Sequence, residues 1–207
     1  MKLKLKYPIE YLGEVSVSQG FGNVHSMYTN MGLKGHNGVD FRTAHGQPVY
    51  ASHDGLASFQ IDSGGGCGVV IVTDKEYEYK DDTTLFKTIY WHLCNSQVEP
   101  QFKSPFEDKT GFTPVKKGDL VGYADNTGMS TGDHLHWALK PCAKGESWGT
   151  FYNTEQNNGY FGCIDPWPFL ENDLEEKLEQ TQLTLIQILT QIVEKLKLEL
   201  KRRGIIT

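Results

Sequence analysis

The chain has 207 residues, of which 38% are hydrophobic and 12% aromatic, so it can bury a sizeable core and is not a wholly disordered protein. Its formal net charge of −6 argues against nucleic acid as a partner, because binding phosphates requires a basic surface. The 22 glycines indicate many tight turns and favour a body built mainly of β-strands.

The amino-terminal residues 1–8 alternate lysine with leucine and end at a proline. They contain neither the apolar core nor the cleavage site of a signal peptide, so we expect no signal peptide and synthesis in the cytoplasm. No stretch of the sequence approaches the roughly 18 to 20 apolar residues of a membrane-spanning helix, so we expect no membrane span.

Residues 15 to about 140 predict an antiparallel β-sheet. Short apolar runs alternate there with turn residues, and no helical pattern separates consecutive runs, which favours antiparallel pairing over βαβ units. The predicted strands are Val49–Ala51, Gly55–Phe59, Val69–Val72, Leu85–Leu93, Leu120–Tyr123 and His134–Leu139.

Two long stretches without a strand pattern, Asn95–Pro114 and Cys142–Ile164, are predicted to be surface loops. The second is rich in Gly, Asn and aromatic residues. It could therefore form the wall of a substrate groove, or it could simply cover the end of the sheet.

The four cysteines, Cys67, Cys94, Cys142 and Cys163, include no C-x-x-C pair, which argues against a structural zinc–thiolate site. We interpret them as buried free thiols. The alternative is a pairing of Cys67 with Cys94, which could lie opposite each other if Val69–Val72 and Thr88–Trp91 form a hairpin.

From about Glu171 to Arg203 the sequence lacks Gly and Pro and predicts one amphipathic helix of about 30 residues, roughly 45 Å long. Asn172 is the expected N-cap, and Gly204 ends the helix. The spacing of the apolar positions mixes heptad and 11-residue steps, so it fixes neither the handedness nor the number of helices in a coiled coil. The apolar stripe comprises Leu174, Leu178, Leu185, Leu189, Ile192, Leu196 and Leu200, widened by Ile186, Ile188 and Val193.

Two histidines, His134 and His136, lie one residue apart in a strand-like run, so both point to the same face. His36 and Asp40 lie nearly a hundred residues upstream. A catalytic zinc typically takes three protein ligands and a water, and imidazole and carboxylate both suit it. One of the paired histidines with His36 and Asp40 would make such a set and leave the other histidine to act on the bound water. This pattern predicts a zinc hydrolase.

The remaining histidines are assigned to solvated loops and turns rather than to a metal site. His25 lies in a stretch rich in polar residues, and His45 and His53 each precede a glycine-containing turn. Asp133 precedes His134 and could either hydrogen-bond a catalytic histidine or face solvent.

Longer motifs surround these residues and extend from about Ser18 to Leu139. In this order and of this length they are highly specific, and through them the chain resembles the lysostaphin/LytM-type zinc endopeptidases, which hydrolyse peptide bonds in bacterial peptidoglycan. The motifs are Ser18–Gly22, Gly35–Phe41, Gly46–Ala51 with Gly55, Tyr90–Leu93, Val115–Gly122 and Asn126–His136.

The resemblance implies an antiparallel sheet of the duplicated hybrid motif type, with the active site in a groove across its face. Position by position, it makes His36, Asp40 and His136 the ligands of one Zn²⁺ per protomer. It places His92 and His134 beside the metal-bound water, one as the general base and the other as a donor to the developing oxyanion, without assigning which is which.

We therefore expect a mainly β zinc peptidase domain in residues 1–170, with its core motifs in 18–140 and a loop-rich extension in 141–170. Residues 171–207 are expected to form a helix for oligomerisation or docking. The expected activity is cleavage of stem peptides or cross-bridges of bacterial peptidoglycan, with zinc-bound water as the nucleophile.

The expected substrate lies outside the cytoplasm although no signal peptide is visible. A bacteriophage enzyme, released as an endolysin or carried in a virion, would reconcile the two. The helix could then form a homo-oligomeric coiled coil or dock on a virion protein. The alternative function is a catalytically silent adaptor or virion structural protein of the same fold that binds wall peptides. Silent relatives are expected to lose ligands, and this chain keeps all three.

Overall fold

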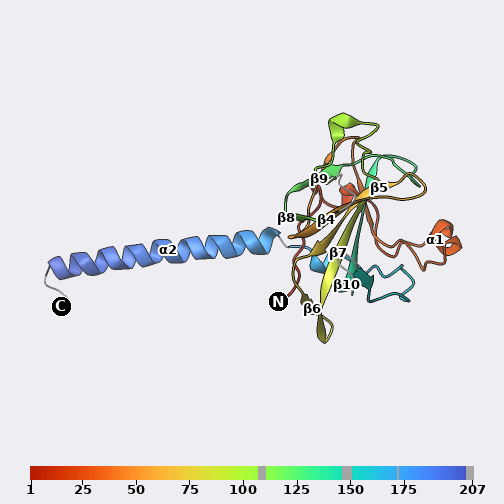
Figure 1. Ribbon diagram of the computed structural model, residues 1–207. Coiled ribbons are helices and arrows are strands. Elements are labelled where there is room, and N and C mark those ends of the chain that lie inside the picture. The colour runs from red at the N-terminus through yellow and green to blue at the C-terminus, as the bar shows by residue number, and fades with distance from the viewer. Residues whose placement is uncertain (107–110, 146–150, 172, 204–207) are drawn as a thin grey trace. The chain divides into compact units, whose positions relative to one another are not determined.

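The computed structural model describes residues 1–106, 111–145, 151–171 and 173–203, and the side chains of the carboxy-terminal helix from residue 182 onwards. The chain divides into two units, Met1–Leu170 and Glu171–Thr207. The first is built around an antiparallel sheet, and the second is a single helix (Figure 1).

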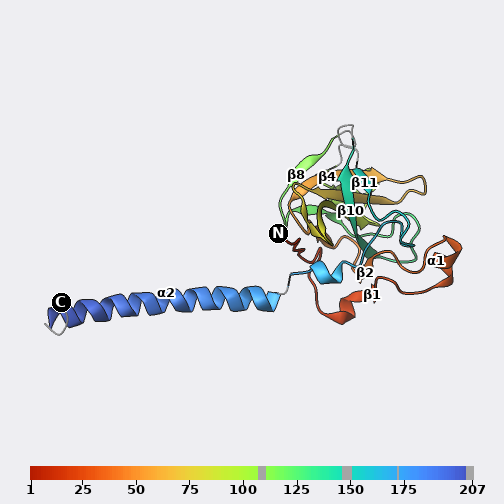
Figure 2. The same cartoon turned by 90° about the horizontal axis from the view of Figure 1, so that it is seen from below.

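Within the described ranges, the main sheet has nine strands in the order β1-β2-β10-β7-β5-β4-β8, with β11 beside β10 and β6 beside β7. Figure 2 shows β10 and β11 next to each other. A second sheet pairs β3 with β9. The predicted mainly β, antiparallel fold with a carboxy-terminal helix is thus confirmed. The strands are β1 Val17–Gln19, β2 Val39–Arg42, β3 Pro48–Tyr50, β4 Gly55–Ile61, β5 Cys67–Thr73, β6 Tyr77–Tyr79, β7 Asp82–Trp91, β8 Thr113–Val115, β9 Leu120–Tyr123, β10 His134–Lys144 and β11 Phe151–Asn153. The helical segments are η1 Glu14–Ser16, α1 Ser26–Asn30, η2 Pro100–Phe102, η3 Trp167–Phe169 and α2 Asp173–Arg202.

Alternation along β2 and β10 separates the core from the polar face of the sheet. Val39, Phe41 and Trp137 are fully buried on the core face. Asp40 and His136 point to the other face, because successive side chains of a strand alternate. The antiparallel register places His136 directly opposite Asp40.

The amino-terminal segment completes the core. Leu3 and Leu5 are buried, while Lys2, Lys4 and Lys6, which alternate with them, are exposed; this explains the lysine–leucine alternation. The backbone N–H of Leu5 donates to the carbonyl of Phe169 at 2.7 Å, so the two ends of the first unit are tied together.

Strand β10 is longer than predicted and reaches Lys144, so the loop expected to begin at Cys142 begins later and contains β11. Pro141 hid this continuation, because proline is unexpected inside a strand. Pro141 cannot donate, but its carbonyl accepts from the N–H of Thr154 at 3.1 Å. The residue opposite it on β7, Phe86, donates its own N–H to the side chain of Thr73 and needs no acceptor on β10.

The sequence also missed several short strands, namely β1, β2, β6, β8 and β11. The expected loop Asn95–Pro114 contains η2 and the first residues of β8. These strands have only three or four residues each, too few for a period-two pattern to stand out.

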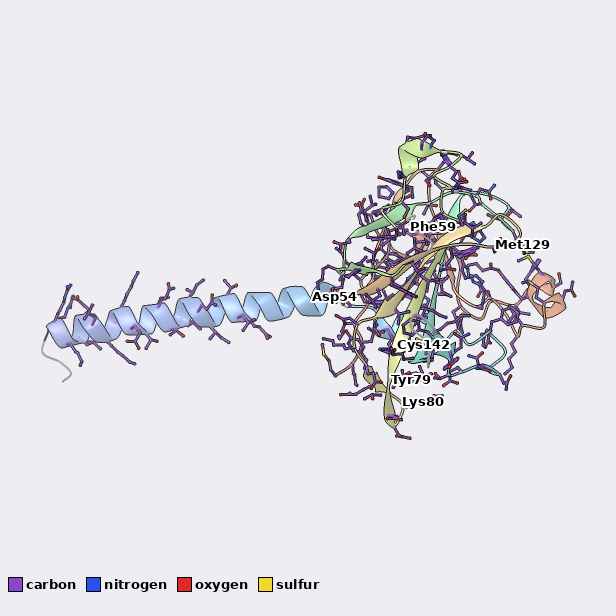
Figure 3. All side chains as sticks on the ribbon, in the orientation of Figure 1. Asp54, Phe59, Tyr79, Lys80, Met129 and Cys142 are labelled. Atoms are coloured by element: carbon purple, nitrogen blue, oxygen red, sulfur yellow. The ribbon has the colours of Figure 1, made fainter. Side chains whose placement is uncertain are left out.

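All four cysteines are buried free thiols, which confirms that interpretation; the suggested pairing of Cys67 with Cys94 is wrong. Cys142 lies within the sheet in β10 (Figure 3). Burial raises the pKa of both Cys142 and Cys163 to about 11.

Helix α2 has 30 residues, which corresponds to about 45 Å. The side chains described from residue 182 project freely around it (Figure 3), and its large aliphatic residues from Leu183 to Leu198 are 46–60% exposed. In the part of the chain that the structure describes, no helix combines the length and apolarity needed to cross a bilayer. The expected cap Asn172 and terminator Gly204, and the side chains of Leu174 and Leu178, lie outside the described residues.

Candidate active site

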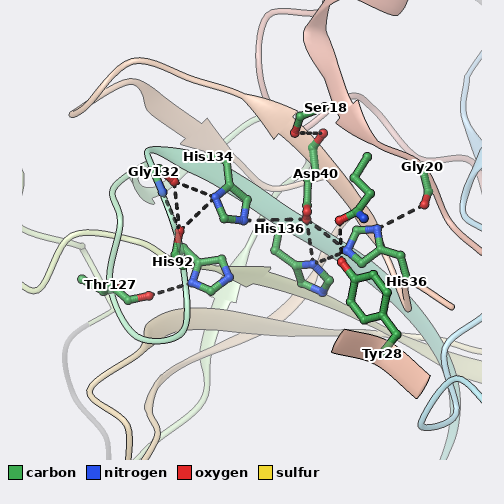
Figure 4. A network of polar contacts seen from close by, with 12 residues as sticks. Ser18, Gly20, Tyr28, His36, Asp40, His92, Thr127, Gly132, His134 and His136 are labelled. Atoms are coloured by element: carbon green, nitrogen blue, oxygen red, sulfur yellow. Dashed lines mark hydrogen bonds and ion pairs between the residues drawn. The ribbon is translucent and has the colours of Figure 1, made fainter. Parts of the chain in front are cut away.

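Five side chains predicted from the sequence meet on the polar face of the main sheet (Figure 4). Asp40 comes from β2, His134 and His136 come from β10, and His92 directly follows β7. His36 lies just before β2. The site therefore spans three adjacent strands, β2, β10 and β7, and its spacing is set by the register of the sheet.

Three of these residues form a tight triangle of ligand atoms. His36 Nε2 lies 3.1 Å from His136 Nδ1 and 3.2 Å from Asp40 Oδ1, and His136 Nδ1 lies 2.9 Å from the same oxygen. Tetrahedral zinc ligands at about 2.0 to 2.1 Å from the ion lie roughly 3.3 Å from one another. The triangle therefore has nearly the dimensions that such an ion requires, and these three residues could hold one metal ion.

Hydrogen bonding fixes which nitrogen of His36 faces the triangle. Its Nδ1 lies 3.1 Å from the carbonyl oxygen of Gly20, which can only accept, so Nδ1 carries the proton. Nε2 of the neutral ring then presents a lone pair to the Asp40 carboxylate, and the two lone pairs repel unless a cation lies between them. The donor set thus fits a divalent metal.

Tyr28 of α1 holds the other side of the His36 ring. The two rings stack with their centroids 5.2 Å apart, and the Tyr28 hydroxyl donates to the side chain of Gln19. Burial and the nearby Asp40 raise the pKa of Tyr28 to about 12, so its hydroxyl stays neutral.

Asp40 is ionised despite its burial. Desolvation alone would raise its pKa, but the adjoining rings of His136 and His36 hold the pKa of this carboxyl well below its usual value. Its backbone carbonyl also accepts from the Ser18 hydroxyl at 3.1 Å, which ties β2 to β1 at this point. Burial lowers the pKa of His136, so this ring is neutral and can offer a lone pair.

His92 and His134 lie beside the triangle with their ring centroids 4.5 Å apart. Each has its Nδ1 bonded to a backbone carbonyl, that of Thr127 at 2.7 Å for His92 and that of Gly132 at 2.8 Å for His134. Because carbonyls only accept, Nδ1 is the protonated nitrogen and Nε2 is left to act in both rings. His134 Nε2 lies 3.8 Å from Asp40 Oδ1.

The backbone at His92 is itself unusual. Its φ angle is 63°, in the left-handed region that non-glycine residues rarely adopt. Such conformations cluster at functional sites, where the surrounding structure holds them. Burial lowers the pKa of His92 to about 4.

The residues that orient the histidines were missed by the sequence analysis. Gly20, Thr127 and Gly132 act through backbone carbonyls, which carry no side-chain signal, although all three lie in the motifs that carried the family resemblance. No pattern in the sequence pointed to Tyr28.

The other histidines lie outside this site. His25 caps α1, with its Nδ1 accepting from the N–H of Met27, and Asp133 is partly exposed near His45. The assignment of His53 to a solvated turn is wrong. It is buried, with Nε2 2.9 Å from the hydroxyl of Thr88, a residue of β7.

Comparison with known proteins gives the family. A metalloprotease of Haemophilus influenzae is 33% identical over 132 residues, which are 64% of this chain and 24% of that protein. The DD-carboxypeptidase/endopeptidase Mpg of Neisseria meningitidis is 30% identical over 135 residues, covering 65% of this chain and 26% of that protein. The catalytic domain of lysostaphin from Staphylococcus simulans aligns with a TM-score of 0.49 at 23% identity, over 74% of this chain and 90% of that domain.

The chain spans about a quarter of the length of these two curated relatives. Peptidase family M23 matches residues 34–149, which contain all five residues of the site. This match covers more than half of the 207 residues, and the chain belongs to Peptidase family M23.

Proposed function

We propose that this chain is a zinc-dependent endopeptidase that hydrolyses peptide bonds in bacterial peptidoglycan. The observation that carries the proposal is the triangle of His36, Asp40 and His136 with two further histidines turned towards it. Relatives named as peptidoglycan DD-endopeptidases, such as ShyA of Vibrio cholerae, support the substrate.

His36, Asp40 and His136 would hold one Zn²⁺ at this site. A catalytic zinc with three protein ligands lowers the pKa of a coordinated water towards ~7 and polarises a carbonyl. The mixed imidazole and carboxylate set suits zinc better than it suits calcium or magnesium, which prefer oxygen ligands alone.

The two remaining histidines would move the proton. Nε2 of a neutral His92 or His134 can accept a proton from the attacking water and later return it to the leaving amine. The ring that is protonated at Nε2 can instead donate to the oxygen of the scissile carbonyl as charge develops there. Because Nδ1 is occupied in both rings, each ring acts through Nε2 alone.

The make-up of the site favours a peptide substrate over the glycan strand. It contains four histidines and one carboxylate, whereas glycoside cleavage normally uses two apposed carboxylates. It also argues against a silent adaptor, because such a protein has no need for a complete ligand triangle with two histidines turned towards it.

Metal analysis and activity together test this proposal. Wild-type protein should hold about one zinc at this site, His36→Ala should empty it, and His92→Ala and His134→Ala should keep the metal but lose about 10²-fold in rate. Mass spectrometry of digested cell wall should reveal new amino and carboxyl termini. New reducing sugars, or a full metal content in His36→Ala, would contradict the proposal.

We further propose that α2 pairs with α2 of a second copy of this chain. Its aliphatic side chains are 46–60% exposed, and each would contribute ~1.5–3 kcal/mol if fully buried. The side chains in question are Leu183, Leu185, Ile186, Ile188, Leu189, Ile192, Val193, Leu196 and Leu198.

The charge pattern of the helix suits an antiparallel copy. Residues 173–180 contain four acidic residues and one basic residue, whereas residues 194–203 contain two acidic and five basic residues. An antiparallel partner would place each acidic end beside a basic end, with the uncharged stretch of residues 180–193 in the middle.

Light scattering of the full chain tests this pairing. The wild type should have the mass of an oligomer, and Leu189→Glu with Ile192→Glu should reduce it to a monomer. Gln191→Glu, which adds a charge at an exposed polar position, is the matched control and should stay oligomeric. A wild-type chain that is monomeric at micromolar concentration would contradict self-association.

We infer that the enzyme acts outside the cytoplasm, because peptidoglycan lies there. Delivery by a bacteriophage particle stays a prediction, to be tested by probing purified particles for the chain.

A further inference from the structure

A second group of metal-binding side chains lies near the active site. His45, Cys94 and Asp125 each offer one ligand atom, and these atoms all lie within 4.8 Å of one another. His45 Nδ1 is 3.0 Å from Asp125 Oδ1, close to the spacing found in the first triangle. We propose that these residues form a second metal site for a borderline or soft divalent cation such as Zn²⁺, Co²⁺ or Cd²⁺.

Glu99 orients the imidazole of His45. His45 Nε2 lies 2.9 Å from Glu99 Oε2, and the carboxylate can only accept, so Nε2 carries a proton. In the neutral ring, Nδ1 then presents its lone pair to the Asp125 oxygen, and these two electron pairs call for a cation between them. A carboxylate on the far nitrogen is the usual partner of a metal-ligating histidine.

Cys94 supplies the donor that favours a metal ion over a proton at this position. Its side chain is 2% exposed, and its thiol has a long contact of 3.6 Å to the carbonyl of Ala124 and interacts with the side chain of Asp125. A proton could bridge His45 and Asp125 without any third group. A thiolate beside them adds a strong ligand for zinc and cadmium, which favours a metal ion at this position. When the sulfur–metal bond forms, the thiol proton passes to solvent, and no redox partner is required.

The backbone holds these segments in fixed positions. The N–H of Gly46 donates to the carbonyl of Ala124, and the N–H of Ala124 donates to Gln47, both at 2.8 Å. The N–H of Cys94 donates to the carbonyl of Tyr123 at 2.8 Å. The three ligand-bearing segments are therefore joined by hydrogen bonds, which favours a preformed site.

The second site has a path to solvent and a link to the first. The side chain of His45 is 39% exposed, so an ion can reach it. The backbone of Asp125 accepts from the N–H of His134 at 3.3 Å and donates to the carbonyl of His92 at 2.9 Å. An ion on Asp125 would thus brace the segment that supports both histidines. The proposal uses none of the five active-site side chains, so it stands apart from the hydrolytic function.

Cadmium titration of the full chain tests this site, because only the second site contains a cysteine. Wild-type protein should bind two equivalents, and one of them should give the ultraviolet charge-transfer band of a cadmium–thiolate bond. Cys94→Ser should lose the band and one equivalent. His36→Ala should lose the other equivalent and keep the band.

Two further variants keep the test decisive. Cys142→Ser removes another buried thiol and should keep the band. His45→Gln leaves every cysteine in place and should weaken the band-forming equivalent at least tenfold, so the proposal remains testable even if Cys94→Ser fails to fold. A wild-type titration without the band, or a band that survives in folded Cys94→Ser, would overturn the proposal and leave His45 as a protonated bridge between two carboxylates.

Discussion

Gly38 offers a direct test of how closely the backbone approaches the metal ligands. A Cβ at this position would lie 2.6 Å from His136 Cε1 and 2.7 Å from the carbonyl oxygen of Trp137. Ordinary contacts between carbon atoms are about 3.5–4.0 Å, so the imidazole or the backbone would have to move by roughly 1 Å. We expect Gly38→Ala to displace His136, one corner of the triangle.

The size of the effect follows from that displacement. Overpacking of this kind costs about 1–3 kcal/mol of stability, and a misplaced ligand should weaken zinc binding about 10- to 100-fold. The rate of hydrolysis at saturating zinc should fall about 10²-fold, as it does for comparable misplacements. The measurements are a competitive zinc titration with a chelator and wall hydrolysis at fixed metal.

The control for this variant is Gly111→Ala, because a Cβ there meets no atom of the described residues within 4 Å. It should match the wild type in metal binding and rate. Wild-type zinc affinity and activity in a folded Gly38→Ala protein would refute the reasoning, because His136 would then tolerate the displacement or would not be a ligand.

Three further predictions rest on other parts of the chain. Burial lowers the pKa of His53 to about 4, so as pH falls below about 6.5 the unfolded state takes up a proton and the folded state does not; the free energy of unfolding should drop by roughly 3 kcal/mol by pH 4. His53→Gln should flatten this part of the dependence of stability on pH, measured by denaturant titration. An unchanged slope in this variant would count against the role of His53. Tyr28→Phe removes only the hydroxyl that bonds Gln19 and should lower activity less than Tyr28→Ala, which also removes the ring stacked on His36; equal losses would place the effect in the hydroxyl. Native protein should react slowly with a thiol reagent at pH 8 because all four cysteines are buried, and rapidly once unfolded; fast labelling of the native chain would be evidence against this burial.

The prediction that His134 and His136 lie on the same face of a strand is correct, because strand periodicity is local. Two residues apart in a strand always share a face, whatever the rest of the fold does. By contrast, the approach of His36 and Asp40 to His136 depends on the antiparallel register between β2 and β10. No spacing within either segment encodes that register. Ligand chemistry therefore grouped His36 and Asp40 with one of the two paired histidines, and only the family resemblance selected His136.

The errors have a common physical cause. His53 looked solvated because glycine and aspartate follow it, yet its burial is decided by Thr88, 35 residues away in β7. Similarly, Pro141 argued against a strand, yet the opposite residue on β7, Phe86, gives its N–H to Thr73 and needs no partner on β10. In both cases a local signal was overridden by a distant partner, which a single sequence does not reveal.

The histidines of this fold are oriented mainly by the backbone. His36, His92 and His134 each give their Nδ1 proton to a carbonyl, whereas His45 gives its Nε2 proton to the carboxylate of Glu99. A side-chain substitution cannot remove a backbone carbonyl, so the orientation of these histidines depends on the backbone conformation of the loops around the active site. This explains why glycines surround the site: Gly38 has no room for a Cβ, and Gly128, at a φ of 74°, turns the chain directly after Thr127. Substitutions at these glycines should therefore alter the chemistry of histidines that they do not replace.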